Sequence, residues 1–232
     1  IRTQLEDSLR RLNQDYVDVF FLHHWDDNIA LEETFETLKE LKEEKKFFQL
    51  GVSNFSAWQV MKAKALAEKY GFPNVDILQP MYNLVKRQAE VEILPMAKSE
   101  NIGVISYSPL GGGLLTGKYE MENNIPNKNS SGRLHDNAKY KLRYGQSWMY
   151  EAASKLQKLA EDINYDPIAL AVAWVSYNDA ITAPIISARN LKQLKPSLDS
   201  VNINLDEETY NLISQISPTP PPATDRLEET SH

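Results

Sequence analysis

Hydrophobic segments of strand length alternate with amphipathic segments of helical length along almost the whole chain. The strand-like segments are residues 16–22, 47–52, 75–78, 103–106 and 183–186. The apolar spacing between them predicts helices at residues 1–12, 31–45, 57–69, 88–100, 148–162, 167–177, 190–198 and 206–216. Such regular alternation is typical of an α/β fold with a parallel sheet. A doubly wound open sheet is disfavoured, because no Gly-x-Gly-x-x-Gly sequence follows the first strand.

Each strand-like segment ends in polar or aromatic residues that are suited to binding. These are His23, Ser53-Asn54, Gln79, Tyr107-Ser108, and Ser187 with Arg189. In a (β/α)8 barrel the carboxyl ends of all strands meet at one face, where the active site lies. We therefore expect a (β/α)8 barrel of the TIM type. Only about five of its βα units are present, so we expect the earlier units to lie upstream of Ile1.

The composition of the chain indicates its domain size, its location and the kinds of partner it can bind. With 232 residues, of which 42% are hydrophobic, the chain can form one sizeable core, and we expect a barrel domain over residues 1–216. Residues 217–232 form a proline-rich tail that we expect to be disordered. The net charge of -7 argues against nucleic acid and anionic membranes as partners, and the absence of cysteine fits a reducing, cytoplasmic location.

Three strand ends are candidates for polar contacts to a ligand. His23 lies at a strand end, where a neutral imidazole can donate a hydrogen bond to a substrate oxygen; a loop-bonded structural histidine is equally consistent, and no histidine spacing indicates a metal. Alternation along the strand also places His24 on the opposite face from His23. Ser53 and Asn54 can bind a flat carboxamide or instead cap the next helix. Gln79 needs a hydrogen-bond partner inside a barrel.

Two later segments are candidates for binding an anion. Glycines at 111–113 allow backbone amides to approach a ligand, and Lys118 adds positive charge. The alternative is a flexible loop, since residues 111–145 show no periodicity. Arg189 precedes a helix whose amino terminus attracts phosphate, although a solvated cationic helix start fits the same residues.

Taken together and in order, these motifs resemble those of the aldo-keto reductases. The shared motifs are Asp15-Tyr16-Val17-Asp18 before His23, Gly51-Val52-Ser53-Asn54-Phe55, Gln79-Pro80-x-Tyr82-Asn83, Tyr107-Ser108-Pro109-Leu110, Gly113-Leu114-Leu115-Thr116-Gly117-Lys118-Tyr119, and Ala188-Arg189-Asn190 with Gln193-Leu194.

The resemblance implies reduction of an aldehyde or ketone by hydride transfer from NADPH, with NADH not excluded. It implies that His23 orients the substrate carbonyl and that Tyr107 stacks beneath the nicotinamide. The implied carboxamide contacts are Ser53, Asn54 and Gln79. The implied pyrophosphate contacts are Ser108, Leu110, Gly112, Leu114, Lys118 and Arg133, and those to the adenosine end are Ser187, Arg189, Gln193 and Ser197.

Two departures from the family pattern matter. The catalytic Asp, Tyr and Lys of the family fall upstream of Ile1, so we expect this chain to be inactive by itself. Pro196-Ser197 replaces the usual Glu-Asn at the adenine end. A non-catalytic, nucleotide-binding regulatory subunit of the same fold is the alternative.

Overall fold

The computed structural model describes residues 1–119, 121–122, 125–126 and 132–230, and it divides into two compact units. The first unit comprises residues 1–80 and 95–105, and the second comprises residues 81–94 and 106–232. Within the segment 111–145, which shows no periodicity in the sequence, residues 120, 123–124 and 127–131 lie outside the described residues. Among the described residues, no helix is both long and apolar enough to cross a membrane.

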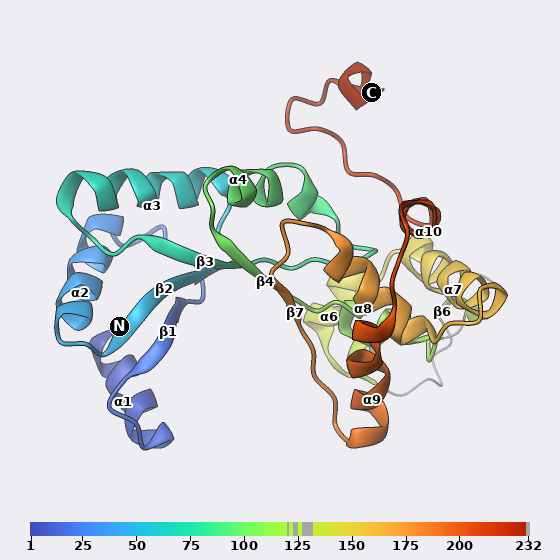
Figure 1. The fold of residues 1–232 in the computed structure, drawn as a ribbon, viewed down its shortest axis with the longest axis horizontal. Helices are drawn as coiled ribbons and strands as arrows, with labels where there is room; N and C mark the ends of the chain where they lie inside the picture. Colours follow the sequence, from blue (N-terminus) through green and yellow to red (C-terminus); the bar gives the residue numbers. More distant parts are fainter. Residues whose placement is uncertain (120, 123–124, 127–131, 231–232) are drawn as a thin grey trace. The chain divides into compact units, whose positions relative to one another are not determined.

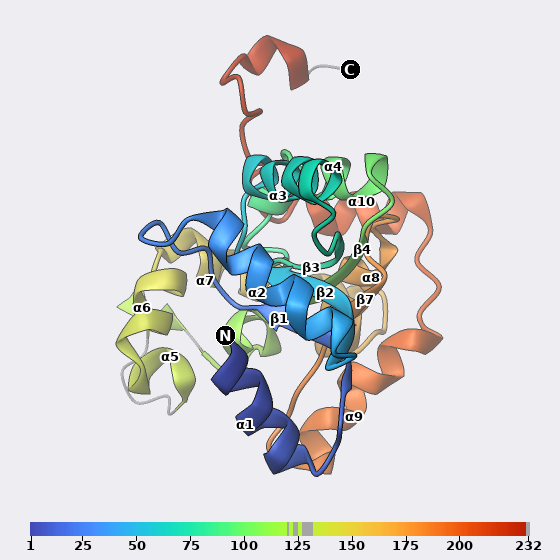
Figure 2. The same ribbon diagram turned by 90° about the vertical axis from the view of Figure 1, so that its left-hand side faces the viewer.

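The first unit is built on parallel strands in the order β1-β2-β3-β4. Helix α2 packs on β2 and α3 on β3, and Figures 1 and 2 show both helices on the same side of the sheet, with α4 beside α3. The bounds are α1 Arg2–Leu12, β1 Val17–Leu22, α2 Leu31–Glu43, β2 Phe47–Ser53, α3 Ala57–Tyr70, β3 Val75–Gln79, α4 Ile93–Ser99 and β4 Gly103–Tyr107.

The core of this unit comes from the apolar faces that the sequence spacing indicates. On α2 the buried residues are Leu31, Phe35, Leu38 and Leu41. They recur every three or four positions, which places them on one helix face toward the sheet. The predicted strands of this unit and its helices at residues 1–12, 31–45 and 57–69 are thus confirmed, apart from shifts of one or two residues at their ends.

A local irregularity in β2 aligns two strand ends. The register of β2 against β3 shifts between Leu50 and Gly51. At that point the carboxylate of Asp76 on β3 accepts a hydrogen bond from the Leu50 N–H, at 2.9 Å. Beyond the shift, Ser53 stands opposite Gln79. The bulge therefore brings two predicted site residues into register.

The predicted helix at 88–100 is wrong in its first part. The structure has a short 3-10 helix, Gln88–Glu90, followed by α4. Pro95 is the reason, because proline has no N–H to donate inside a helix and is tolerated only in its first turn. It stands in the first turn of α4.

The second unit is mainly helical, and α8 lies at its centre. Residues Ala169 to Val175 of α8 are all buried, and α8 packs against α7, α9, α10 and β7. In the strand order, β7 follows β4, whose last two residues belong to this unit. The bounds are β5 Met121–Glu122, β6 Ile125–Pro126, α5 Arg133–Asp136, α6 Ala138–Tyr144, α7 Ser147–Asp162, α8 Pro167–Tyr177, β7 Ala183–Ile185, α9 Leu191–Asp199 and α10 Glu207–Ser214.

The expectation of an irregular segment over residues 111–145 is also wrong in part. Residues Gly111–Thr116 form 3-10 turns interrupted by a kink at Gly112 and Gly113, and α5 and α6 follow later in the segment. The side chain of Asn137 caps α6 by accepting from the N–H groups of Lys139 and Tyr140. Both helices are shorter than the window in which helical periodicity becomes visible.

A buried polar network ties the last helix of this unit to the segment after β3. The Arg87 guanidinium donates to the carboxylate of Glu90 at 2.9 Å and to the carbonyl of Ser214 at 2.8 Å. Glu90 also accepts from the hydroxyl of Tyr82 at 2.7 Å. Asp206 caps α10, because its side chain accepts from the Thr209 N–H at 2.8 Å. After α10 the chain forms no helix or strand until a 3-10 helix at Leu227–Thr230, and the disorder expected for residues 217–232 stays a prediction.

Candidate functional site

A pocket of about 550 Å³ in the second unit collects most of the residues predicted to bind phosphate and adenosine. Its size lies within the range typical of small-molecule sites. Its lining comes from the end of β4 and the segment after it, the start of α5, the end of β7, the segment between β7 and α9, and the first turn of α9, with one side chain from α8. The lining residues are Tyr107, Ser108, Pro109, Leu110, Gly112, Gly113, Thr116, Lys118, Arg133, Ile168, Ile185, Ile186, Ser187, Ala188, Arg189 and Gln193.

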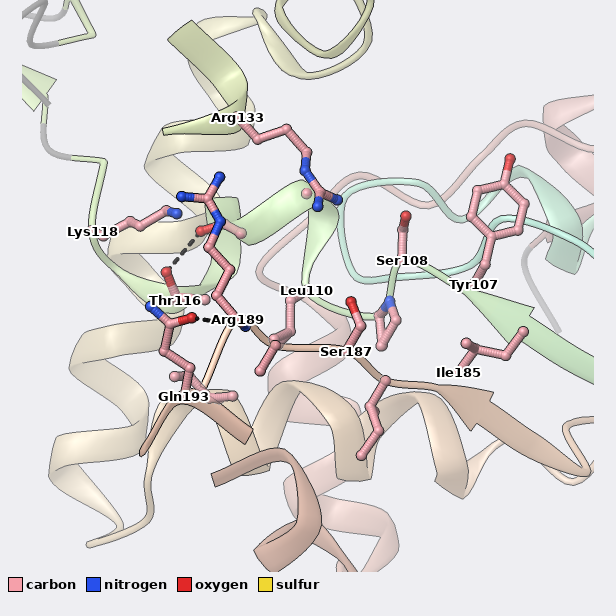
Figure 3. A pocket seen from close by; sticks show the side chains of 16 residues that line it. Tyr107, Ser108, Leu110, Thr116, Lys118, Arg133, Ile185, Ser187, Arg189 and Gln193 are labelled. Atoms are coloured by element: carbon pink, nitrogen blue, oxygen red, sulfur yellow. Dashed lines mark hydrogen bonds between the residues drawn. The ribbon is translucent and has the colours of Figure 1, made fainter. Parts of the chain in front are cut away.

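The pocket has a cationic end and an aromatic end. Figure 3 shows Lys118, Arg189 and Arg133 reaching toward one end, whereas Tyr107 lies at the other. Among the described residues, none of these three cations forms an ion pair with a carboxylate. Three neighbouring positive charges without a counter-charge favour a polyanionic ligand such as a phosphate ester.

Glycine is needed at residues 111–113 because the backbone there is left-handed and because Lys118 lies close to it. Gly111, Gly112 and Gly113 have φ angles of 57°, 67° and 96°, the left-handed region that glycine adopts without steric cost. A Cβ on Gly113 would lie 3.3 Å from the Lys118 ammonium nitrogen. The glycine run thus leaves room for that ammonium against the backbone. The donor set and this cradle both fit the phosphates of a dinucleotide.

Arg133 is supported by an aromatic side chain that the sequence reasoning did not select. The Arg133 guanidinium lies 5.2 Å from the centre of the Tyr140 ring, and one of its N–H groups is 3.4 Å from the Tyr140 hydroxyl. Tyr140 stands against Gly112, where an added Cβ would be 2.7 Å from the ring. Ring stacking of this kind stabilises a guanidinium in one position. No motif marks Tyr140 in the sequence.

Two of the residues predicted to bind the phosphates or the adenosine end are absent from the pocket lining. Leu114 is fully buried, and Ser197 is 3% exposed, with its carbonyl accepting from the Ser200 hydroxyl. Neither side chain is available to a ligand, so their predicted roles find no support in the pocket. Conversely, Ile168 and Ile185 line the pocket without having been predicted, because apolar residues of a helix and a strand carry no signal that separates lining from core.

In the first unit, hydrogen bonds join the ends of β1, β2 and β3. The side-chain N–H groups of Asn54 donate to the His23 carbonyl at 2.9 Å and to the Ser53 hydroxyl at 3.1 Å. The Ser53 hydroxyl in turn donates to the Gln79 carbonyl at 2.9 Å. The predicted residues His23, Ser53, Asn54 and Gln79 are therefore neighbours, as the strand order requires.

The local geometry tests two predictions about these strand-end residues. The helix-cap alternative for Ser53 and Asn54 is wrong, because α3 begins later, with Ser56 as its N-cap residue. The backbone N–H of Ser56 donates to the side-chain oxygen of Gln59 at 2.8 Å. The prediction that His24 lies on the opposite face from His23 is also wrong. Their ring centroids are 4.1 Å apart, since β1 ends at Leu22 and strand alternation stops there.

A metal centre has no support in the described part of the chain, where no three His, Cys, Asp or Glu side chains gather closely enough to hold an ion.

Comparison with known proteins identifies the family. A sequence model described as "Aldo/keto reductase family" matches residues 1–218. The chain belongs to the aldo/keto reductase family.

The relatives are oxidoreductases of greater length. An uncharacterized oxidoreductase, YrpG, of Bacillus subtilis is 34% identical over 95% of this chain and 64% of its own. Aflatoxin B1 aldehyde reductase member 2 of Mus musculus is 34% identical over 85% of this chain and 57% of its own. A glycerol dehydrogenase of Gluconobacter oxydans is 30% identical in structural superposition, with a TM-score of 0.74 over 93% of this chain and 62% of its own. The chain thus spans less than two thirds of the length of these relatives.

Proposed function

We propose that this protein reduces an aldehyde or ketone by hydride transfer from NADPH. The observation that carries the proposal is the pocket with three cations at one end, none of them in an ion pair with a described carboxylate, and Tyr107 at the other (Figure 3). Family membership and the oxidoreductase names of the relatives agree with it. We propose further that the parallel strands belong to a (β/α)8 barrel, in which strand ends face the ligand.

In the second unit, the proposal assigns the dinucleotide phosphates to the cationic end of the pocket. Lys118 and Arg133 bind the pyrophosphate, and Arg189 binds the 2'-phosphate that distinguishes NADPH from NADH. Guanidinium groups suit this role because they donate parallel hydrogen bonds to phosphate oxygens. The amino terminus of α9 adds a favourable dipole, and the ring of Tyr107 offers a flat surface for the nicotinamide.

In the first unit, the proposal assigns the nicotinamide carboxamide to Ser53, Asn54 and Gln79. The hydrogen bonds that join these residues to one another hold the donors and acceptors in place before a ligand arrives. NADPH, when bound, supplies the hydride. The residues named here position it, which is where much of the rate of such a reaction originates. His23 donates a hydrogen bond that orients the substrate carbonyl.

Titration of the protein with NADPH and with NADH, followed by cofactor fluorescence, tests the binding site. We expect Arg189→Gln to weaken NADPH binding by about tenfold or more, the effect of one charged hydrogen bond, and to leave NADH binding almost unchanged. Lys192→Gln, an exposed cation on α9 outside the pocket lining, is the matched control.

Equal loss of NADPH affinity in both variants would contradict the assignment of Arg189. Consumption of NADPH with a panel of aldehydes tests the reaction itself. NADPH binding without turnover of any aldehyde would favour the non-catalytic alternative.

A further inference from the structure

Tyr119 follows Lys118 directly in the sequence, yet it lies outside the pocket lining. Its side chain is buried, with 4% exposed, and the Lys118 ammonium lies 4.8 Å from the centre of its ring. Two glycines confine the same ammonium, because a Cβ on Gly113 would lie 3.3 Å from its nitrogen and a Cβ on Gly132 would lie 3.2 Å from it. One ring face and two stretches of bare backbone therefore hold the Lys118 ammonium in place.

The hydroxyl end of Tyr119 contacts the start of α5. The hydroxyl oxygen accepts a hydrogen bond from the buried N–H of Leu134 at 3.3 Å, and the Tyr119 ring lies 5.6 Å from the His135 ring. A Cβ on Gly132 would overlap the Tyr119 hydroxyl, so glycine at that position allows the contact to form. These partners flank Arg133 in the sequence. Tyr119 therefore fixes the backbone from which the Arg133 side chain extends.

Holding both cations in advance favours the binding of an anion. Lysine and arginine side chains lose rotamer freedom when they bind a ligand, and this loss opposes binding. A cation that already rests on an aromatic ring has less freedom to lose. Tyr140 supports Arg133 in this way, and Tyr119 supports Lys118. Tyr119 alone of these two rings also contacts the backbone beside the other cation, so it can set the separation of the two charges.

We propose that Tyr119 is a positioning residue of the phosphate site, which sets the separation of Lys118 and Arg133 in the unliganded protein. This inference rests on the proposed function, which assigns both cations to the pyrophosphate. Pyrophosphate carries two anionic groups at a fixed spacing, so its affinity depends on the spacing of the cations that bind it. Tyr119 lies outside the pocket lining, and it acts on the ligand only through these two side chains.

Calorimetric titration with inorganic pyrophosphate and with NADP⁺, arranged as double-mutant cycles, tests this role. Tyr119→Leu removes both the ring and the hydroxyl, whereas Tyr119→Phe removes only the hydroxyl. We expect Lys118→Gln to weaken binding about tenfold when Tyr119 is present. In Tyr119→Leu this effect should be smaller by a factor of about two to five, which corresponds to one exposed cation–π contact. In Tyr119→Phe the effect of Lys118→Gln should be unchanged, while that of Arg133→Gln should decrease.

Two controls separate positioning from a general loss of structure. Arg189 comes from the segment between β7 and α9, so Arg189→Gln should change NADP⁺ affinity by the same factor with and without Tyr119. Tyr150→Phe changes a buried tyrosine of α7 outside the pocket lining and should leave both affinities unchanged. Additive cycles for Lys118 and Arg133 would overturn the inference. Equal coupling of Tyr119 to Arg189 would overturn it as well, because that result indicates partial unfolding.

The two ligands also distinguish failure of this inference from failure of the proposed function. Each ligand that binds the wild type decides the role of Tyr119 through its own cycles. Binding of pyrophosphate without binding of NADP⁺ would refute the proposed function alone. Binding of neither ligand would overturn both the function and the positioning role.

Discussion

Replacing Gly112 by alanine tests how the glycine run supports the phosphate end of the pocket. The φ angle of Gly112 is 67°, and alanine in that region costs about 1–2 kcal/mol. Its Cβ would also lie 2.7 Å from the Tyr140 ring, which adds the cost of overpacking, about 1–3 kcal/mol. We therefore expect Gly112→Ala to lower the free energy of unfolding by about 2–5 kcal/mol.

Gly111→Ala is the control for the backbone part of this effect. Gly111 has a φ angle of 57°, yet the nearest atom to an added Cβ is 3.5 Å away, so only the backbone cost of about 1–2 kcal/mol applies. Urea denaturation measures both values. Because Tyr140 supports Arg133, Gly112→Ala should also weaken NADPH binding more than Gly111→Ala does. Equal losses of stability and affinity in the two variants would refute the contact argument, as would a failure of Tyr140→Ala to reduce the cost of Gly112→Ala.

Two further predictions concern ionisable groups. Burial raises the pKa of Tyr144 to about 12. The buried neutral phenol therefore contributes its full stabilisation below the ordinary tyrosine pKa of about 10, and this stabilisation is lost as the pH rises through the folded value. Tyr144→Phe should make the loss of stability at alkaline pH, followed by circular dichroism, less steep. The N–H of Thr209 lowers the pKa of Asp206, so the cap stabilises α10 above the ordinary Asp pKa of about 4 and is lost as the pH falls below it. Asp206→Ala should thus lower the free energy of unfolding at pH 7 and leave it almost unchanged in strong acid, as measured by urea denaturation at both pH values; an equal decrease at both would show that the carboxylate is not the cap.

The strand ends were predictable from the sequence because their signal is local. A short apolar run followed by a polar residue marks both the strand and the position where its last side chain reaches a site. The strand-end positions of Gln79 and Tyr107 were predicted in this way, and the order of the parallel strands then brings Gln79 beside Ser53. Their contacts with a ligand stay a prediction.

The supporting residues were not predictable, since their roles depend on contacts between distant segments. Tyr140 lies on a helix too short to show periodicity, within a segment that reads as irregular. The importance of Tyr140 comes from Gly112 and Arg133, which contact it only in the folded unit. The proline in α4 and the early end of β1 likewise changed local geometry in ways that apolar spacing does not encode.

The most direct measurement is the structure of this protein in complex with NADP⁺. Our account predicts the phosphates within hydrogen-bonding distance of Lys118, Arg133 and Arg189, and the nicotinamide ring stacked on Tyr107 with its carboxamide on Asn54 and Gln79. A dinucleotide bound away from these side chains, or a nicotinamide that does not contact Tyr107, would contradict it.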